Sequence, residues 1–376
     1  MQIFSFTETI TKVSNEFFQN LRQLNLNEDG LSLIKDEIKL QLRTKLNVAP
    51  AAEAYLDFIN LMSKDYIDPN TIINEVDRIT SEDFKTFFNE IFNSLYLRGF
   101  IHGTLSAEDS KKLFEHINNL FLNNVHGVID DKSKNHLSTH SVLKGNYFYR
   151  KKIKDTQNVI HAVANFYRIG PYNIRNLISS NLIKDLCGNI YFTELRTKNQ
   201  LGYIAKGKII HEGDMLYYLI YVQGSVKTPD LMDEEIEKVV DLMKLMIRKV
   251  DENKFKSTLA NVVKKIGKND TSFKERTIRL WSEIIHMRYH YNLYQEVAKE
   301  AEKINVESLN ETFFEIFKKL KKVSIQLFSS HSGNISSELN SLANSKKIII
   351  NDLNYFRNHP SKISLISAGN ISKEKK

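Results

Sequence analysis

The sequence has little of what interrupts helices or cross-links a chain. It contains 5 prolines and 14 glycines among 376 residues, below the average usage of about 5% and about 7%. Because both residue types break helices or form turns, their scarcity predicts long elements and many helices. One cysteine, Cys187, cannot form an intramolecular disulfide. This excludes a secreted disulfide scaffold and leads us to expect a reducing, cytoplasmic location.

The sequence also lacks membrane and nucleic-acid signals. It has no apolar run of the roughly 18 residues that a membrane span needs, and its first residues do not resemble a signal peptide. The net charge of +8 is compatible with nucleic acid, an acidic partner or an acidic substrate. However, 53 basic residues are interspersed with 45 acidic ones, and nucleic-acid motifs are missing. We therefore expect neither a nucleic-acid partner nor a membrane.

Apolar periodicity predicts helices and strands along most of the chain. Thr80 and Ser106 each precede an acidic residue at the spacing of a helix N-cap. His211 and Glu212 lie at a predicted hairpin turn, where we expect them to be solvated. The expected helices cover 13–24, 34–42, 80–95, 106–120, 174–186, 229–250 and 306–320, and the expected strands cover 96–102, 147–153, 159–169, 203–222 as a hairpin, and 323–328.

An internal repeat suggests two related domains, which the chain length also favours. Shifted by 225 positions, seven residues of 79–95 meet identical residues of 304–320. Chance similarity of two amphipathic helices remains the alternative. Between the two segments, residues 123–145 lose apolar periodicity and become polar, as in a linker. We therefore expect an α+β chain with one domain over 1–130, a linker over 131–145 and a second domain over 146–376.

Motifs for metal or nucleotide binding are missing from the sequence. HExxH, its inverse HxxEH, cysteine and histidine zinc spacings, and glycine-rich phosphate loops do not occur. His136/His140 and His286/His290 have i,i+4 spacing, which on a helix would place both rings on one face. For the second pair, surface or aromatic packing is favoured over ligation. We expect Cys187 to be buried rather than a nucleophile, and no metal ligands in this chain.

One dense segment, 192–205, could carry chemistry. Arg196 and Tyr203 stand seven residues apart, and Tyr203 opens a strand directly after Gly202. A guanidinium could bind carbonyl groups of an extended peptide, and a phenol could donate to a developing oxyanion. From these residues alone, an arginine at a helix end and a tyrosine in a core strand would be the ordinary interpretation.

The same segment carries a resemblance. ELRTKNQLGYIA is similar to the L-R-T-x-x-Q-L-G-Y-x-V motif of insulinase-type (pitrilysin family) zinc metallopeptidases, in the C-terminal half of their insulin-degrading-enzyme-like members. Similarity continues, in the family's order, through LRGFIHGTLSAEDSKKL at 97–113, LWSEIIHMRYHY at 280–291 and INDLNYFRNHPS at 350–361. The resemblance thus covers essentially the whole chain.

The resemblance implies a fold and roles for three residues. It implies two homologous insulinase-family domains, each with a mostly antiparallel sheet packed with helices: an incomplete third domain over 1–130 and a fourth over 146–376. Tyr203 would donate to the oxyanion, Arg196 would bind the substrate backbone, and Phe192 would line a side-chain pocket. Ala205 departs conservatively from the usual valine.

The resemblance also implies what this chain does not supply. The family holds zinc in its N-terminal half through HxxEH, and this chain resembles only the half that closes over the peptide. We therefore expect a substrate-enclosing half that hydrolyses peptides only with a zinc-bearing N-terminal half, on the same or a separate polypeptide, and that is inactive alone. An oligomer is a further option. The alternatives are a catalytically dead pseudoenzyme or peptide-binding subunit, or a truncated gene product.

Overall fold

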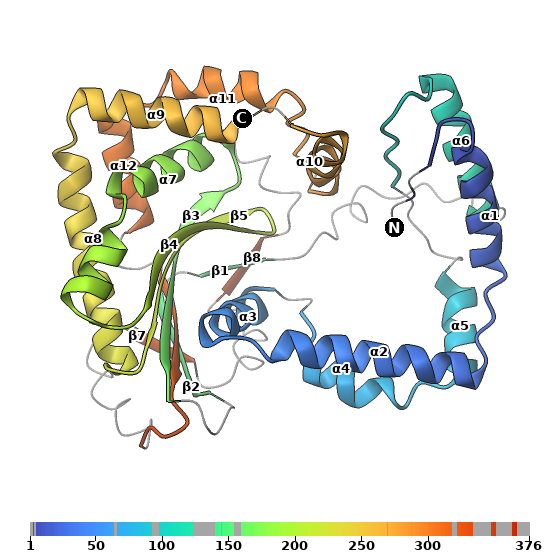
Figure 1. Ribbon diagram of the computed structural model, residues 1–376, viewed down its shortest axis with the longest axis horizontal. Coiled ribbons are helices and arrows are strands. Elements are labelled where there is room, and N and C mark those ends of the chain that lie inside the picture. Colours follow the sequence, from blue (N-terminus) through green and yellow to red (C-terminus); the bar gives the residue numbers. More distant parts are fainter. Residues whose placement is uncertain are drawn as a thin grey trace. The chain divides into compact units, whose positions relative to one another are not determined.

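A computed structural model gives the arrangement of the helices and strands (Figure 1). It divides into two compact units, one built from 1–47, 67–133 and 277–281, the other from 48–66, 134–276 and 282–376. The structure describes residues 3, 5–63, 66–91, 98–122, 140–143, 145–153, 159–268, 270–286, 288–317, 322–333, 347–350 and 363–366.

The regular elements among the described residues of the first unit are helices. The predicted N-caps are confirmed: the Thr80 hydroxyl accepts a hydrogen bond from the Asp83 N–H at 3.1 Å, and the Asp83 carboxylate accepts one from the Thr80 N–H at 2.8 Å. This reciprocal arrangement satisfies two backbone donors at the helix start. The helices are α1 (Ile10–Arg22), α2 (Glu28–Leu46), α4 (Pro69–Val76), α5 (Ser81–Ile91) and α6 (Ala107–Leu122).

Two expectations for this unit are wrong. The sequence predicts a buried face on the helix that contains Phe84 and Phe88, yet both side chains are only half-buried and α5 has no buried residue. Residues 98–102, expected to form a strand, have neither helical nor strand structure. The helix itself is present as α5, but local apolar spacing cannot decide its burial or a strand's pairing, because both depend on what packs against the segment. Residues 92–97 lie outside the described part.

The second unit contains a six-stranded mixed sheet in the order β4-β5-β3-β6-β2-β7. Three of its five pairings, β4 with β5, β5 with β3 and β3 with β6, are antiparallel, and the two at the β7 end are parallel. A short β1 (His140–Leu143) pairs antiparallel with β8 (Ile363–Ile366). The sheet strands are β2 (Asn146–Lys152), β3 (His161–Pro171), β4 (Ile204–Glu212), β5 (Met215–Gly224), β6 (Lys322–Phe328) and β7 (Lys347–Ile350).

Helices cover one face of this sheet and bury the larger apolar core. Figure 1 shows α7, α8, α9 and α12 gathered on the same side of β3, β4 and β5. The predicted long helix begins at Pro229. Thr228, whose position directly before Pro229 predicts a helix cap, makes no side-chain cap hydrogen bond. The helices that supply this core are α7 (Ile174–Cys187), α8 (Pro229–Arg248), α9 (Glu252–Ile266), α11 (Leu293–Ala301) and α12 (Val306–Ile316). Helix α10 (Phe273–Ile285) lies between α9 and α11 in the sequence. None of the helices within the described ranges is long and apolar enough to cross a bilayer.

The opposite face of the sheet is covered by α3 (Pro50–Met62), a helix that comes early in the chain. The ring of Phe58 stacks on Phe166 of β3 at 3.8 Å between centroids, and Tyr217 of β5 meets it edge-on at 4.9 Å. Lys151 of β2 forms ion pairs with Glu53 and Asp57 of α3 at 2.8 and 2.7 Å. The core of the second unit therefore uses residues from within 1–130. The predicted domain boundaries stay predictions, and 131–139 lie outside the described residues.

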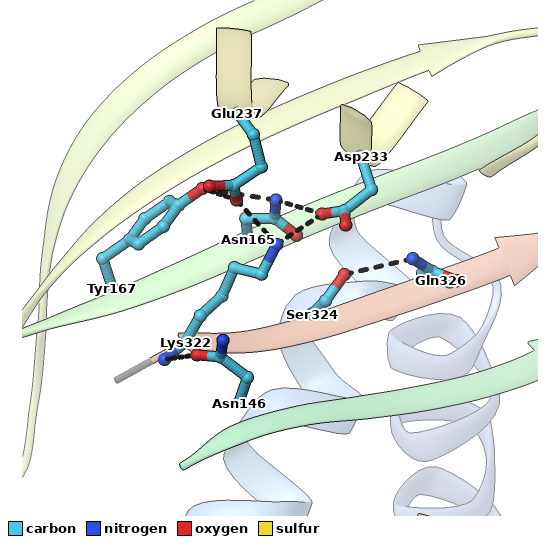
Figure 2. Close-up of polar contacts among 8 residues, drawn as sticks. All are labelled: Asn146, Asn165, Tyr167, Asp233, Glu237, Lys322, Ser324 and Gln326. Atoms are coloured by element: carbon cyan, nitrogen blue, oxygen red, sulfur yellow. Dashed lines mark hydrogen bonds and ion pairs between the residues drawn. The ribbon is translucent and has the colours of Figure 1, made fainter. Parts of the chain in front are cut away.

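A buried polar network lies between the sheet and α8 (Figure 2). The Lys322 ammonium contacts Asp233 at 2.7 Å and Glu237 at 2.6 Å, and Asn165 and Tyr167 of β3 donate hydrogen bonds to the same two carboxylates. Burial alone would lower the pKa of Lys322, but the two carboxylates outweigh it and raise the pKa. The network fixes α8 against the first residue of β6.

Candidate functional site

The segment singled out from the sequence begins as a π-helix, η2 (Tyr191–Lys198). The Asn199 N–H bonds to the Glu194 carbonyl five residues back at 3.0 Å, which is the π-helical spacing. Tyr191 and Leu195 are buried, which leaves Phe192 and Arg196 on the exposed side. Short π-helical stretches are rare and frequently occur at functional sites.

Phe192 and Arg196 contact each other on this exposed side. The guanidinium carbon of Arg196 lies 4.6 Å from the centroid of the Phe192 ring, within the range of a cation–π interaction. Phe192 is 47% exposed although it is a large apolar side chain. The pair therefore offers an aromatic surface beside a set of planar hydrogen-bond donors.

Two glycines bring the end of the motif against strand β5. A Cβ atom on Gly202 would lie 2.0 Å from the carbonyl oxygen of Gln223, and one on Gly224 would lie 2.0 Å from the carbonyl oxygen of Leu201. Real Cβ atoms do not approach so closely, so the two backbones can cross only where both residues are glycine. This crossing explains Gly202 of the motif. The sequence did not single out Gly224.

Tyr203 stands directly after this crossing and is 58% exposed. Its phenolic oxygen Oη accepts a hydrogen bond from Nε2 of Gln223 at 3.1 Å. Gln223 is 2% exposed, and its Oε1 accepts a hydrogen bond from the Ala51 N–H of α3 at 3.1 Å. Sequence reasoning missed Gln223, because a glutamine within an apolar strand carries no motif.

Two further contacts connect η2 with its surroundings. The ring of Tyr191 lies over Gly207 of β4, where a Cβ atom would come within 2.5 Å of it. Asn199, just after η2, donates a hydrogen bond to Glu235 of α8 at 3.1 Å. Packing thus supports the elements that carry Phe192, Arg196 and Tyr203. Phe192 and Arg196 meet directly, whereas Tyr203 bonds to Gln223.

The pair His286 and His290 does not have the geometry that a helix would give it. Helix α10 ends at Ile285, so His286 and His290 lie beyond it. His286 Nδ1 lies 2.8 Å from the Ser282 carbonyl, and His290 Nδ1 lies 2.6 Å from a carboxylate oxygen of Glu296. His136 of the other pair lies outside the described residues. Within the part of the chain that the structure describes, no group of three or more potential ligands could hold a metal ion.

The structure bears out one further expectation and contradicts another. Cys187 is buried, and burial raises the pKa of its thiol to about 12, as expected of a packing residue.

His211 and Glu212, expected to be solvated, are half-buried. Arg288 donates to His211 Nε2 at 3.1 Å, and the Tyr55 hydroxyl donates to Glu212 at 3.1 Å. Burial raises the pKa of Glu212. The sequence thus predicted the hairpin turn correctly but could not predict which residues pack around it.

Known proteins that are similar to this chain belong to the group that the motif around Arg196 and Tyr203 indicated. A family profile described as PQQ synthase PqqF-like, C-terminal lobe domain 4, matches residues 182–281. The chain is 25% identical over 309 residues to the A-factor-processing enzyme of Saccharomyces cerevisiae, covering 78% of this chain and 28% of that protein. It is 22% identical over 290 residues to the insulin-degrading enzyme homolog of Dictyostelium discoideum, covering 75% and 29% respectively.

A solved structure with the same fold agrees with these sequence matches. The crystal structure of pitrilysin matches with a TM-score of 0.80 and 13% identity, covering 97% of this chain and 38% of that one. The class is thus an α+β lobe of the pitrilysin fold. Together with the sequence matches, this fold supports a likeness to the C-terminal half of insulinase (pitrilysin) family proteins. It spans less than a third of the length of the yeast and Dictyostelium relatives, at 28% and 29%.

Proposed function

We propose that this chain is the C-terminal, substrate-enclosing half of an insulin-degrading-enzyme-like zinc metalloendopeptidase that hydrolyses peptides. The carrying observation is the exposure of Arg196, Phe192 and Tyr203 on one continuous motif whose buried residues hold it in place. The names of the yeast and Dictyostelium relatives, an A-factor-processing enzyme and an insulin-degrading enzyme homolog, support a peptide substrate.

Each of the three exposed residues has a role that suits its chemistry. Tyr203 donates its phenolic hydrogen to the oxyanion that forms when a peptide carbonyl is attacked. Arg196 donates hydrogen bonds to backbone carbonyls of the extended peptide. The Phe192 ring, which the guanidinium of Arg196 contacts, limits the orientations of that guanidinium. Phe192 also lines a pocket for a substrate side chain.

The proposal assigns zinc to another part of the enzyme. The described residues of this chain do not supply a set of zinc ligands, so a zinc-bearing N-terminal half, on the same or a separate polypeptide, would hold the metal. The chain is accordingly inactive alone in this proposal. A cytoplasmic location is part of it, because a single cysteine suits a reducing compartment.

The test combines the chain with a zinc-bearing half and follows cleavage of a fluorogenic peptide. Tyr203→Phe removes one oxyanion donor, so we expect kcat to fall by roughly 10²- to 10³-fold with little change in KM. Tyr294→Phe is the matched control, because Tyr294 has a similar exposed fraction of 56% on α11. An unchanged kcat for Tyr203→Phe would reject its role. Peptide binding without cleavage in every mixture would favour a peptide-binding subunit.

A further inference from the structure

A buried glutamine links the exposed tyrosine of the site to the start of a helix. Gln223 lies on β5, on the sheet face that α3 covers, where Tyr217 and Leu219 belong to the apolar core. Its amide bonds to Tyr203 Oη through Nε2 and to the Ala51 N–H through Oε1, each at 3.1 Å. An amide at 2% exposure is costly unless both of its ends are bonded.

The contact with α3 fixes which way the amide faces. Ala51 is near the first residue of α3, where backbone N–H groups have no partner within the helix. Ala49 at the N-cap position has no side-chain acceptor, and Pro50 has no N–H. The Ala51 N–H can only donate, so it must meet Oε1 of Gln223, and Nε2 must then face Tyr203.

This orientation determines what the phenol does. Because Gln223 donates to Oη, the bond uses an acceptor site of the oxygen and leaves the phenolic hydrogen available for another acceptor. A hydrogen bond received at the oxygen also polarises the O–H group and strengthens it as a donor. The crossing of Gly202 and Gly224 brings Tyr203, directly before β4, beside Gln223 of the neighbouring strand β5.

We propose that Gln223 is a positioning residue for Tyr203: anchored on the Ala51 N–H, it donates to the phenol and so directs the phenolic hydrogen toward the substrate oxyanion. This inference rests on the proposed function, in which Tyr203 is the oxyanion donor. Gln223 itself need not touch the substrate. The competing explanation is that Gln223 only caps α3 and has no effect on the phenol.

The variant Gln223→Glu separates the two explanations. The new carboxyl keeps an acceptor for the Ala51 N–H, so the cap survives, but in its ionised form it cannot donate and would attract the phenolic hydrogen to itself. We expect a fall in kcat of about 10²-fold or more, as for Tyr203→Phe, with little change in KM. A kcat equal to that of the unsubstituted protein at every pH tested, including pH values where the new carboxyl is ionised, would overturn the proposal.

A double-mutant cycle tests whether Gln223 acts through Tyr203. If it does, adding Gln223→Glu to Tyr203→Phe lowers kcat no further, because the phenolic hydrogen is already missing. Independent, multiplicative losses would overturn the proposal. Relative activity of the single Gln223→Glu variant should also recover as the pH falls through the pKa of the new carboxyl, because its protonated form can donate again. A structural cap would show no such recovery.

A readout that needs no catalysis keeps this proposal distinct from the proposed function. In the chain labelled with ¹³Cζ tyrosine, the Tyr203 signal is assigned by its loss in Tyr203→Phe. We expect it to move in Gln223→Leu and in Gln223→Glu, with Gln223→Glu melting at the temperature of the unsubstituted chain. A stationary signal in both variants overturns the proposal. A moving signal with normal kcat for Tyr203→Phe would confirm the hydrogen bond and reject the catalytic role of Tyr203, and with it the proposal.

Discussion

At the scale of single residues, the motif is explained by close contacts as much as by chemistry. Gly202 and Gly224 are required because two backbones cross there, and Tyr203 is directed by the strand that follows this crossing. Arg196 and Phe192 are kept outward because Tyr191 and Leu195 of the same π-helix are buried. The chemistry of the exposed side chains therefore depends on the tightly packed residues beside and beneath them.

Adding a methyl group at the crossing should destabilise the fold. Gly202→Ala places a Cβ atom 2.0 Å from the Gln223 carbonyl oxygen, which belongs to the backbone and cannot move aside cheaply. We expect a loss of about 1–3 kcal/mol or more in the free energy of unfolding, measured by urea denaturation. Gly103→Ala is the control, because a Cβ atom there meets nothing within 4 Å. Equal stability of the two variants would contradict the close approach.

At the scale of elements, α8 is held on the sheet by charge as well as by apolar packing. Beyond the network around Lys322, Arg150 of β2 bonds to Asp230 at the start of α8 at 2.6 Å. Asp230, Asp233 and Glu237 recur at helical spacing, so one face of α8 presents carboxylates to the sheet. The alternating pattern of β6, with Lys322, Ser324 and Gln326 on this face, supplies the other side.

Removing the buried lysine should cost much more than removing an exposed one. Lys322→Met leaves two carboxylates without their cation, and we expect a loss of about 3–5 kcal/mol in the free energy of unfolding. Lys238→Met, on the exposed face of α8 where Lys238 pairs with Glu235 at 2.7 Å, should change it far less, because solvent screens an exposed pair. Chemical denaturation at neutral pH measures both. Similar losses would mean that the buried pair contributes no more than a surface pair.

The effect of Lys322 should also depend on pH in one direction. The folded state raises its pKa above the ordinary value of 10.5, because the carboxylates of Asp233 and Glu237 outweigh the opposing effect of burial. The lysine's contribution is therefore complete below pH 10.5 and is lost as the pH rises through the raised pKa. The difference in stability between the unsubstituted chain and Lys322→Met should stay constant from pH 7 to 10 and shrink only above that range.

At the scale of the whole molecule, the second unit includes a helix from far upstream in the chain. Helix α3 supplies Ala54, Phe58, Leu61 and Met62 to the core on its face of the sheet. It also supplies the Ala51 N–H that orients Gln223. The candidate site and its supporting core thus depend on a segment that lies more than a hundred residues before the motif.

Truncating the central aromatic of α3 should therefore destabilise the second unit. Phe58→Ala removes a fully buried ring that stacks on Phe166, and we expect a loss of about 3–5 kcal/mol in the free energy of unfolding. Phe87→Ala, which truncates a 60% exposed ring on α5, should change it by about 0.5 kcal/mol or less. Thermal unfolding followed by circular dichroism compares them. If Phe58→Ala melted like Phe87→Ala, the packing of α3 on the sheet would be wrong.

The sequence by itself determined the features that depend on neighbouring residues. The caps at Thr80 and Ser106 and the hairpin that turns near Glu212 were identified from local spacing, whereas the motif around Arg196 and Tyr203 was recognised by its resemblance to a known family. The caps and the hairpin each require hydrogen bonds or side-chain alternation over only a few positions, so the pattern and its cause lie in the same segment.

Only the tertiary structure decided which distant groups meet. Gln223 bonds to Ala51 across 172 positions, and Lys322 reaches Asp233 and Glu237 across 89 and 85. No periodicity encodes such pairs, because they depend on which elements pack together once the chain has folded. For the same reason His211 was expected in solvent although Arg288, 77 positions away, contacts it. Interactions between neighbouring residues thus place Tyr203 in its segment, and packing between distant elements places Gln223 where it can bond to the Tyr203 hydroxyl.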